Sequence, residues 1–235
     1  MSVFHFKQFT IHQDKTAMKV GTDSILLGAW LQINLSCKNV LDIGTGTGLL
    51  ALMIAQKNAK VKITALEIDE EASSQAKQNT ELSKWKDRIK IVNIDANKWT
   101  SSSRYDLFVS NPPYFSDSLR GENSSRTSAR HQVEFKTQNL LELWIKLGSN
   151  SSELACILPV NQAVLLIDLV LKNSYYLKIQ TLVRSNKKGE VIRQMLLFSK
   201  EKAPTQVSEL CIYNEDRSYS KSFIELTKDF YLGLD

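Results

Sequence analysis

The sequence predicts an α/β fold: a single open, mostly parallel seven-stranded sheet with helices on both faces and a small N-terminal extension. Short apolar runs alternate with segments of helical period from residue 40 to residue 198. Several of these runs end in glycine, acidic or asparagine residues, and α/β sheets hold their ligands at the carboxyl ends of their strands. The 235 residues suit one domain, with an extension over 1–39, a core over 40–200 and a C-terminal strand and helix over 201–235.

Composition narrows the classes of function. The three cysteines, Cys37, Cys156 and Cys211, stand singly among apolar neighbours, so we expect core side chains in a reducing compartment and no metal site. No apolar run approaches the roughly 18 residues of a membrane span, and residues 1–11 do not resemble a signal peptide. We therefore expect a cytoplasmic protein. The net charge of +5 permits a polyanionic partner without requiring one.

The N-terminal segment and the glycine-rich segment form the first elements. Residues 2–20 alternate apolar and polar positions, which predicts a short strand or hairpin, and Gly-Thr-Asp at 21–23 predicts a cap before an apolar helix over 24–31. Residues 40–50, VLDIGTGTGLL, then combine an apolar strand, a glycine turn and the start of a helix. Gly44, Gly46 and Gly48 let the backbone approach a ligand closely, beside the free N–H groups of the helix N-terminus.

The spacing of this turn separates it from another nucleotide-binding motif. A dinucleotide-binding fold has G-x-G-x-x-G, whereas this chain has D-x-G-x-G-x-G with Asp42 in front. A strand-to-helix turn without a ligand is the alternative interpretation. The D-x-G-x-G-x-G pattern resembles motif I of S-adenosylmethionine (SAM)-dependent methyltransferases.

Two acidic residues follow at the ends of the next strands. Glu67 closes a predicted strand over 60–68, 19 residues after Gly48, where a carboxylate can accept hydrogen bonds from both ribose hydroxyls of a nucleoside. Asp69 is expected to serve only as an N-terminal charge on a helix over 71–84. A third strand over 88–95 ends in Asp95 and Ala96, which suit an adenine amine and the adenine ring. A turn aspartate is the alternative at Asp95.

The fourth predicted strand, residues 105–110, runs directly into Asn111, Pro112, Pro113 and Tyr114. Two prolines can simply end a strand, but that does not explain the asparagine before them or the aromatic residue after them. The Asn111 side-chain oxygen and the Pro112 carbonyl can each accept one N–H of a planar amine, which makes its nitrogen more nucleophilic and orients it. Tyr114 offers a face for stacking a flipped base.

Longer stretches resemble one family. NPPY after a motif I loop marks methyltransferases that act on exocyclic or amide nitrogens. FKQFTIHQDKTAMKVGTDSILLGAW near the N-terminus, NPPYF, R-x-x-A-R-H at 126–131 and the closing DFYLGL are similar to the bacterial tRNA(1)(Val) adenine-N6 methyltransferase family, over nearly the whole chain. The resemblance implies a Rossmann-like class I methyltransferase fold, SAM as cofactor, and the adenine 3′ to the anticodon of tRNA as target, at position 37.

Together with the residue patterns, the resemblance indicates the site. The expected cofactor-binding residues are Thr22, Asp23, Asp42, Gly44, Thr45, Gly46, Gly48, Glu67, Ile68, Asp95, Ala96 and Asn111. The expected catalytic residues are Asn111, Pro112, Pro113 and Tyr114, with substrate contacts from Tyr114, Phe115, Arg126 and Arg130. Residues 20–23 are expected to close over the methionine end of the cofactor. Many relatives of the wider class have Asp where this chain has Glu67, and the longer carboxylate still reaches a ribose diol.

The basic segment 116–134 has two interpretations: a solvated surface loop, or a loop that grips phosphates or closes over a substrate. His131 is expected to begin a helix rather than to accept a proton. We expect a monomer that binds tRNA and needs neither membrane nor metal.

Other functions share part of these patterns. A protein glutamine-N5 methyltransferase would share NPPY, although that family has a long helical N-terminal domain and only 39 residues precede Val40 here. Methylation of guanine-N2 or of DNA adenine also stays open. A dehydrogenase would need the other glycine spacing, and an RNA-binding module without catalysis would not need a cofactor site beside Asn111.

The remaining elements complete the expected sheet. Helical period predicts helices over 135–147 and 161–171, and apolar runs predict strands over 154–158, 178–184 and, antiparallel, 190–198. Residues 208–234 are expected to form a C-terminal strand and helix. Four basic residues near the sheet edge suit either solvated charges or an extended tRNA-binding face: Arg184, Lys187, Lys188 and Arg193.

Overall fold

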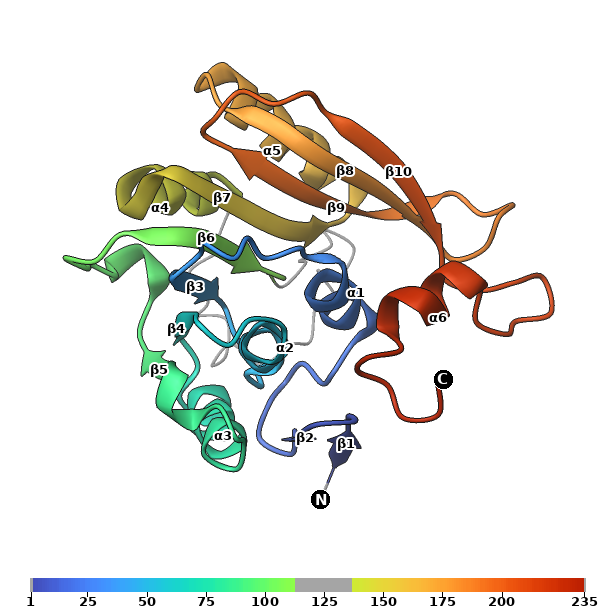
Figure 1. Cartoon of the computed structure of the whole chain (residues 1–235), viewed down its shortest axis with the longest axis horizontal. Coiled ribbons are helices and arrows are strands. Elements are labelled where there is room, and N and C mark those ends of the chain that lie inside the picture. Colours follow the sequence, from blue (N-terminus) through green and yellow to red (C-terminus); the bar gives the residue numbers. More distant parts are fainter. Residues whose placement is uncertain (1, 113–136, 235) are drawn as a thin grey trace, which may run out of the picture.

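The computed structural model describes residues 2–112 and 137–234 (Figure 1). Within these residues, eight strands form one sheet of order β10-β8-β9-β7-β6-β3-β4-β5, and two more form an N-terminal hairpin. The sheet strands are β3 (Asn39–Ile43), β4 (Lys62–Glu67), β5 (Ile89–Asn93), β6 (Tyr105–Ser110), β7 (Gly148–Leu158), β8 (Tyr176–Arg184), β9 (Val191–Ser199) and β10 (Gln206–Cys211). β9 pairs antiparallel with β7 and β8, and the other pairings are parallel. The mostly parallel α/β fold is confirmed.

The predicted strand number was wrong by one. The C-terminal strand β10 joins the same sheet, in parallel pairing with β8 along its whole length. Most of its residues are exposed and it lies at the edge of the sheet, so its sequence lacks the continuous apolar run of a central strand. Its place in the sheet depends on pairing with β8, which local pattern does not encode.

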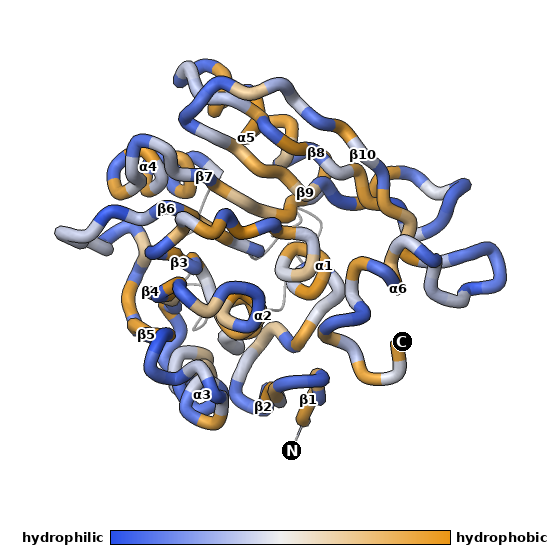
Figure 2. The backbone as a smooth tube through the Cα atoms, viewed as in Figure 1, coloured by the Kyte–Doolittle hydropathy of each residue, from blue (hydrophilic) through white to orange (hydrophobic). Residues whose placement is uncertain are grey.

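Helices cover both faces of the sheet, as predicted. The helices are α1 (Thr22–Trp30), α2 (Leu49–Lys57), α3 (Glu70–Glu81), α4 (Thr137–Leu147), α5 (Val160–Lys172) and α6 (Lys221–Thr227), with short 3₁₀ turns at Lys86–Arg88 and Ala96–Lys98. α1, α2 and α6 contribute to one buried apolar cluster and α4 and α5 to another, on opposite sides of the sheet (Figure 1). Figure 2 shows β9 as hydrophobic and the turns after β8 and β10 as hydrophilic.

The N-terminal extension packs against the C-terminal segment. β1 (Val3–His5) and β2 (Thr10–His12) form the expected hairpin, and the Lys7 backbone N–H donates to the Phe230 carbonyl at 2.8 Å. Phe6 stacks on Phe9 with ring centroids 4.6 Å apart and forms an antiparallel bridge with Tyr231 of the C-terminal segment. The same apolar cluster therefore includes side chains from the extension, the core and the C-terminal helix.

The C-terminal end of α1 is held by a lysine side chain of the neighbouring helix α2. Lys57, at the end of α2, donates from Nζ to the carbonyls of Gly28, Ala29 and Leu31 at 3.3, 2.7 and 2.5 Å. α1 has no basic residue in its own last turn, so Lys57 supplies the positive charge that its unpaired carbonyls favour. A Cβ on Gly28 would lie 2.6 Å from the Met53 sulfur, so glycine permits this close packing of α1 on α2.

We predict that Lys57→Met lowers the free energy of unfolding by about 1 to 3 kcal/mol, because the substitution leaves the α1 carbonyls without their donor. Chemical denaturation of the two proteins measures the difference. Lys77→Met is the matched control, since Lys77 is an exposed lysine of α3. Equal stability losses in the two variants would contradict a specific role for Lys57.

Candidate active site

The glycine loop lies between β3 and α2 with a backbone that only glycine adopts readily. Gly44, Gly46 and Gly48 have φ values of 71°, 57° and 84°, in the left-handed region. A Cβ on Gly44 or Gly46 would meet nothing within 4 Å, so the loop turns bare backbone toward open space. The predicted strand, glycine turn and helix are confirmed, and the loop has room for a ligand against its backbone.

The loop is fastened to the end of the neighbouring strand β4. The backbone N–H groups of Gly44 and Thr45 both donate to the Leu66 carbonyl, at 2.9 and 3.0 Å. The next residue, Glu67, is 9% exposed, and its carboxylate accepts from the Gly46 N–H at 2.8 Å and from the Asp69 N–H at 3.0 Å. Glu67 thus lies against the glycine loop at the carboxyl edge of the sheet, where its sequence position predicts it.

Asp42 lies beneath the loop rather than on its surface. It is fully buried, and one carboxylate oxygen accepts from the Thr45 hydroxyl at 2.6 Å. Burial, with a smaller contribution from the nearby Glu67 charge, raises the pKa of Asp42 to about 7, although the hydrogen bond from the Thr45 hydroxyl lowers it. In this structure Asp42 holds Thr45 and the shape of the loop.

The end of β5 carries the next two predicted residues. Asp95 accepts from the Asn97 backbone N–H at 2.9 Å and begins the 3₁₀ turn, while Ala96 is buried. This is the contact of a turn aspartate, and the predicted adenine contact stays a prediction. Ile68, the residue after Glu67, is 50% exposed. Asp69 accepts from the Ala72 N–H at 2.8 Å as the N-cap of α3, which confirms its helix-terminal role.

Asn111 lies at the same edge of the sheet as the glycine loop. β6 pairs with β3 so that Val109 is opposite Asp42, and continuing this register places Asn111 level with Gly44. The Ser110 hydroxyl donates to the Ile43 carbonyl at 2.8 Å, which ties the two strand ends together. The Asn111 side-chain Nδ2 donates to the Ser24 hydroxyl at 2.7 Å, and Pro112 is buried. The other predicted residues of this region lie outside the described residues: Pro113, Tyr114, Phe115, Arg126, Arg130 and His131.

The beginning of α1 lies beside Asn111. The helix starts at Thr22, two residues earlier than predicted, and its N-cap is Gly21, which makes no side-chain capping bond. Gly21 thus caps the helix within the predicted segment 21–23, whereas the Asp23 carboxylate lies in the first turn and pairs with Arg193 of β9 at 2.8 Å. The sequence allowed two interpretations of Arg193, an edge charge or part of a tRNA-binding face. No local sequence pattern indicated that it pairs with Asp23.

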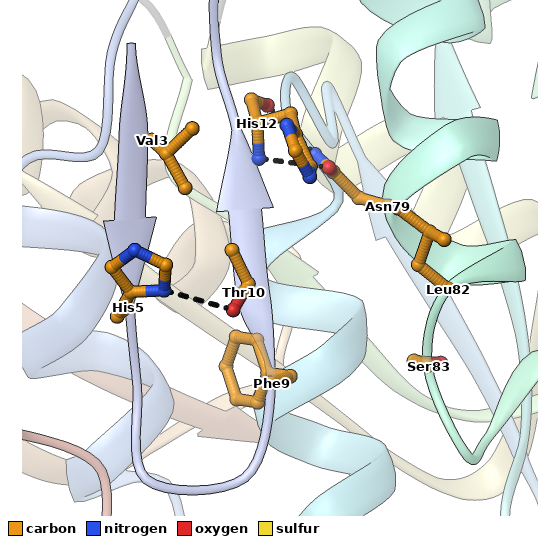
Figure 3. A pocket seen from close by; sticks show the side chains of 8 residues that line it. All are labelled: Val3, His5, Phe9, Thr10, His12, Asn79, Leu82 and Ser83. Carbon is orange, nitrogen blue, oxygen red and sulfur yellow. Dashed lines mark hydrogen bonds between the residues drawn. The ribbon is translucent and has the colours of Figure 1, made fainter. Parts of the chain in front are cut away.

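Asn79 of α3 connects the N-terminal hairpin to the glycine loop, a link that sequence reasoning missed. Its side chain accepts from the His12 N–H and donates to the carbonyls of His12 and Thr47, each at 2.9 Å. Figure 3 shows the bond to the His12 N–H. His12 and Asn79 line a surface hollow of about 460 Å³, together with His5 and Thr10. Asn79 thus links the extension to the glycine loop, and the closure of residues 20–23 over the cofactor stays a prediction.

Within residues 2–112 and 137–234, no group of three or more His, Cys, Asp or Glu side chains could hold a metal ion. In the same residues, no helix is long and apolar enough to cross a membrane. Cys37 and Cys156 are buried free thiols, and burial raises the pKa of Cys37 to about 12.

The buried carboxyl group gives a pH-dependent prediction. In the folded protein Asp42 keeps its proton up to about pH 7, whereas its ordinary pKa in the unfolded chain is 3.8. The folded state therefore binds more protons between these values, and the contribution of Asp42 to stability falls as pH rises from about 4 to 7. Asp42→Asn removes this penalty and keeps an acceptor for Thr45.

We predict that ligand-free Asp42→Asn is more stable than the parent protein at pH 8, by roughly 2 to 4 kcal/mol. The difference should shrink toward pH 5. Denaturation midpoints across this pH range measure it. Asp87→Asn, in an exposed 3₁₀ turn, is the control and should show no such trend. A constant difference at all pH values would contradict a raised pKa at Asp42.

Comparison with known proteins agrees with this geometry. A family model described as the methyltransferase small domain matches residues 16–131. Among solved structures, a predicted O-methyltransferase from Agrobacterium tumefaciens matches with a TM-score of 0.66 at 16% identity, covering 88% of this chain and 96% of that one. TrmK from M. capricolum in complex with S-adenosyl-homocysteine matches with a TM-score of 0.54 at 15% identity, covering 77% and 69%. These structures share the class I methyltransferase fold.

Curated relatives share the sequence over nearly its full length. The tRNA1(Val) (adenine(37)-N6)-methyltransferase of Trichodesmium erythraeum is 43% identical, over 97% of this chain and 97% of that protein. The protein of the same name from Tolumonas auensis is 41% identical, over 98% and 97%. The predicted resemblance is confirmed: the chain belongs to the tRNA1(Val) (adenine(37)-N6)-methyltransferase family.

Proposed function

We propose that the protein transfers the methyl group of SAM to the exocyclic N6 of adenine in tRNA, at adenine 37 of tRNA1(Val). The observation that carries the proposal is the position of Asn111 at the sheet edge, level with Gly44 and tied to β3 through Ser110. An amide side chain there can reach a nitrogen atom beside a ligand on the glycine loop. The relatives of this name at 41–43% identity support the same target.

The residues around the loop fit the parts of SAM. The open backbone at Gly44 and Gly46 and the N-terminus of α2 suit the polar methionine part. The Glu67 carboxylate, already accepting two backbone N–H groups, suits the ribose hydroxyls. Ile68 and Ala96 offer apolar contact to the adenine ring and Asp95 an acceptor for its amine. Thr22 and Asp23 begin α1 and directly precede Ser24, which is hydrogen-bonded to Asn111.

The chemistry that SAM supplies when bound is an electrophilic methyl group on a cationic sulfur. The chain's task is to present the amine, whose lone pair is delocalised into the adenine ring. The Asn111 oxygen and the Pro112 carbonyl each accept one N–H of the amine, which draws electron density onto nitrogen and fixes its direction. Proline holds φ constant, so its carbonyl is oriented in advance. A strong base is unnecessary, because the proton can leave the nitrogen after the bond to the methyl carbon forms.

The substrate contacts proposed for the rest of the motif lie outside the described residues. Tyr114 and Phe115 follow the catalytic prolines and suit stacking of the flipped adenine. Arg126 and Arg130 suit tRNA phosphates, which would make affinity depend on salt. We also propose that the protein acts as a cytoplasmic monomer, formed as one domain with its extensions at 1–39 and 201–235, and that it uses no metal.

We predict that Glu67→Ala weakens binding of S-adenosylhomocysteine by roughly 1 to 3 kcal/mol, through loss of charged hydrogen bonds to the ribose. Isothermal calorimetry measures the affinity. Glu71→Ala is the matched control, because Glu71 is an exposed carboxylate in the first turn of α3. Unchanged affinity in Glu67→Ala would remove the ribose assignment, and tighter binding of a nicotinamide cofactor would reject the methyltransferase function.

The substrate is tested with radiolabelled SAM and three parallel acceptors: total tRNA, a release factor and DNA. We predict label in tRNA, and mass spectrometry of the digested nucleosides should identify N6-methyladenosine. Asn111→Ala should lower kcat by about 10² to 10³, the typical cost of one preorganised hydrogen-bond partner, while S-adenosylhomocysteine still binds.

The other outcomes separate the alternatives. N2-methylguanosine would show that a different base is modified, and label in the release factor alone would show a glutamine-N5 methyltransferase. Label in DNA alone would indicate a DNA adenine enzyme. If Asn111→Ala kept full kcat, the amide would have no part in the transfer.

A further inference from the structure

The first turn of α1 connects two distant parts of the sheet edge. Asp23 pairs with Arg193 of β9, and the adjacent Ser24 accepts a hydrogen bond from Asn111 after β6. Ser24 lies in the first turn of a helix, where a serine commonly bonds to its own helix terminus. Its hydroxyl oxygen accepts a hydrogen bond from a side chain 87 residues away in sequence, the amide at the end of β6.

The direction of an asparagine amide decides whether it can serve the proposed reaction. One end of the amide is an acceptor, and the other end carries two donors. The N6 amine of adenine donates, so only the oxygen end can receive it, and a reversed amide would place N–H against N–H. A serine hydroxyl can accept from Nδ2 or donate to the oxygen, so Ser24 fixes the place of the amide and the substrate amine itself selects the oxygen end.

Ser24 has the position for this task. Its hydroxyl oxygen lies 2.7 Å from Asn111 Nδ2. The helix that carries it cannot shift easily, because Ile25, Leu26 and Leu27 are at most 1% exposed. The Asp23–Arg193 pair holds the start of α1, and Lys57 binds the carbonyls at its end.

We propose that Ser24 is a positioning residue for methyl transfer, which holds the Asn111 amide in place at the sheet edge through its hydrogen bond to Nδ2. This inference rests on the proposed function. Ser24 acts through Asn111, so its loss should lower kcat and leave the affinity for S-adenosylhomocysteine unchanged. The expected loss is about threefold to tenfold in kcat, the effect of one net hydrogen bond.

The first test compares two substitutions of nearly equal shape. Ser24→Thr keeps the hydroxyl and should retain kcat within about twofold, whereas Ser24→Val lacks it and should lose about threefold to tenfold. Ser149→Ala is the control, because Ser149 makes a similar partly buried bond to Asp106 at the opposite edge of the sheet. Its kcat should stay unchanged. Equal kcat in the Thr and Val variants would overturn the proposal, whether both are active or both are slow.

The second test removes the amide on which Ser24 acts. Asn111→Ala leaves Ser24 without an Asn111 side chain to hold. Adding Ser24→Ala to this background should change kcat less than twofold, although Ser24→Ala alone should lower it about threefold to tenfold. An equal loss in both backgrounds would overturn the proposal. If Asn111→Ala is too slow to measure, the Thr and Val pair decides.

Measurement of the parent protein separates this inference from the function on which it rests. A parent protein that methylates no tRNA would reject the proposed function. A parent protein that methylates tRNA, with Ser24→Val equally active, would reject only the role of Ser24.

Discussion

The rest of the site depends on the attachment of the glycine loop to the end of β4. Two loop N–H groups share the Leu66 carbonyl, and the Gly46 N–H donates to the Glu67 carboxylate. This attachment requires left-handed backbone at the glycines, which explains why side chains are excluded there. It also brings Glu67 against the loop, so the acidic residue and the glycine backbone share one surface at the carboxyl edge of the sheet.

Parallel pairing extends this surface across the sheet. Because β3, β4, β5 and β6 run in the same direction, their carboxyl ends meet at one edge. Each of these ends carries one residue of the site, either as the last residue of the strand or within two residues after it: Gly44, Glu67, Asp95 and Asn111. Their proximity is therefore a consequence of topology, and the long-range Ser110 bond to Ile43 fixes the relative height of the two strands that carry the loop and the amide.

A buried carboxyl group beneath the loop has a cost in stability. Asp42 is removed from water, and its ionised form is disfavoured, so neutral pH is near the limit at which it keeps its proton. Its bond to Thr45 lies inside the turn that faces the ligand. A site that gives up stability to hold a loop in shape is common where function requires a defined geometry.

Sequence patterns alone determined the features that depend on local geometry. The strand runs, the glycine turn and the asparagine before two prolines restrict φ or hydrogen bonding within a few residues, and the structure confirms the described part of them. The tertiary structure decided the place of β10 in the sheet and the partners of Ser24, Asp23 and Lys57. Asn111 is 87 residues from Ser24 and Arg193 is 170 residues from Asp23, so no local pattern encodes either pair. Such contacts exist only after the sheet has brought its strand ends together.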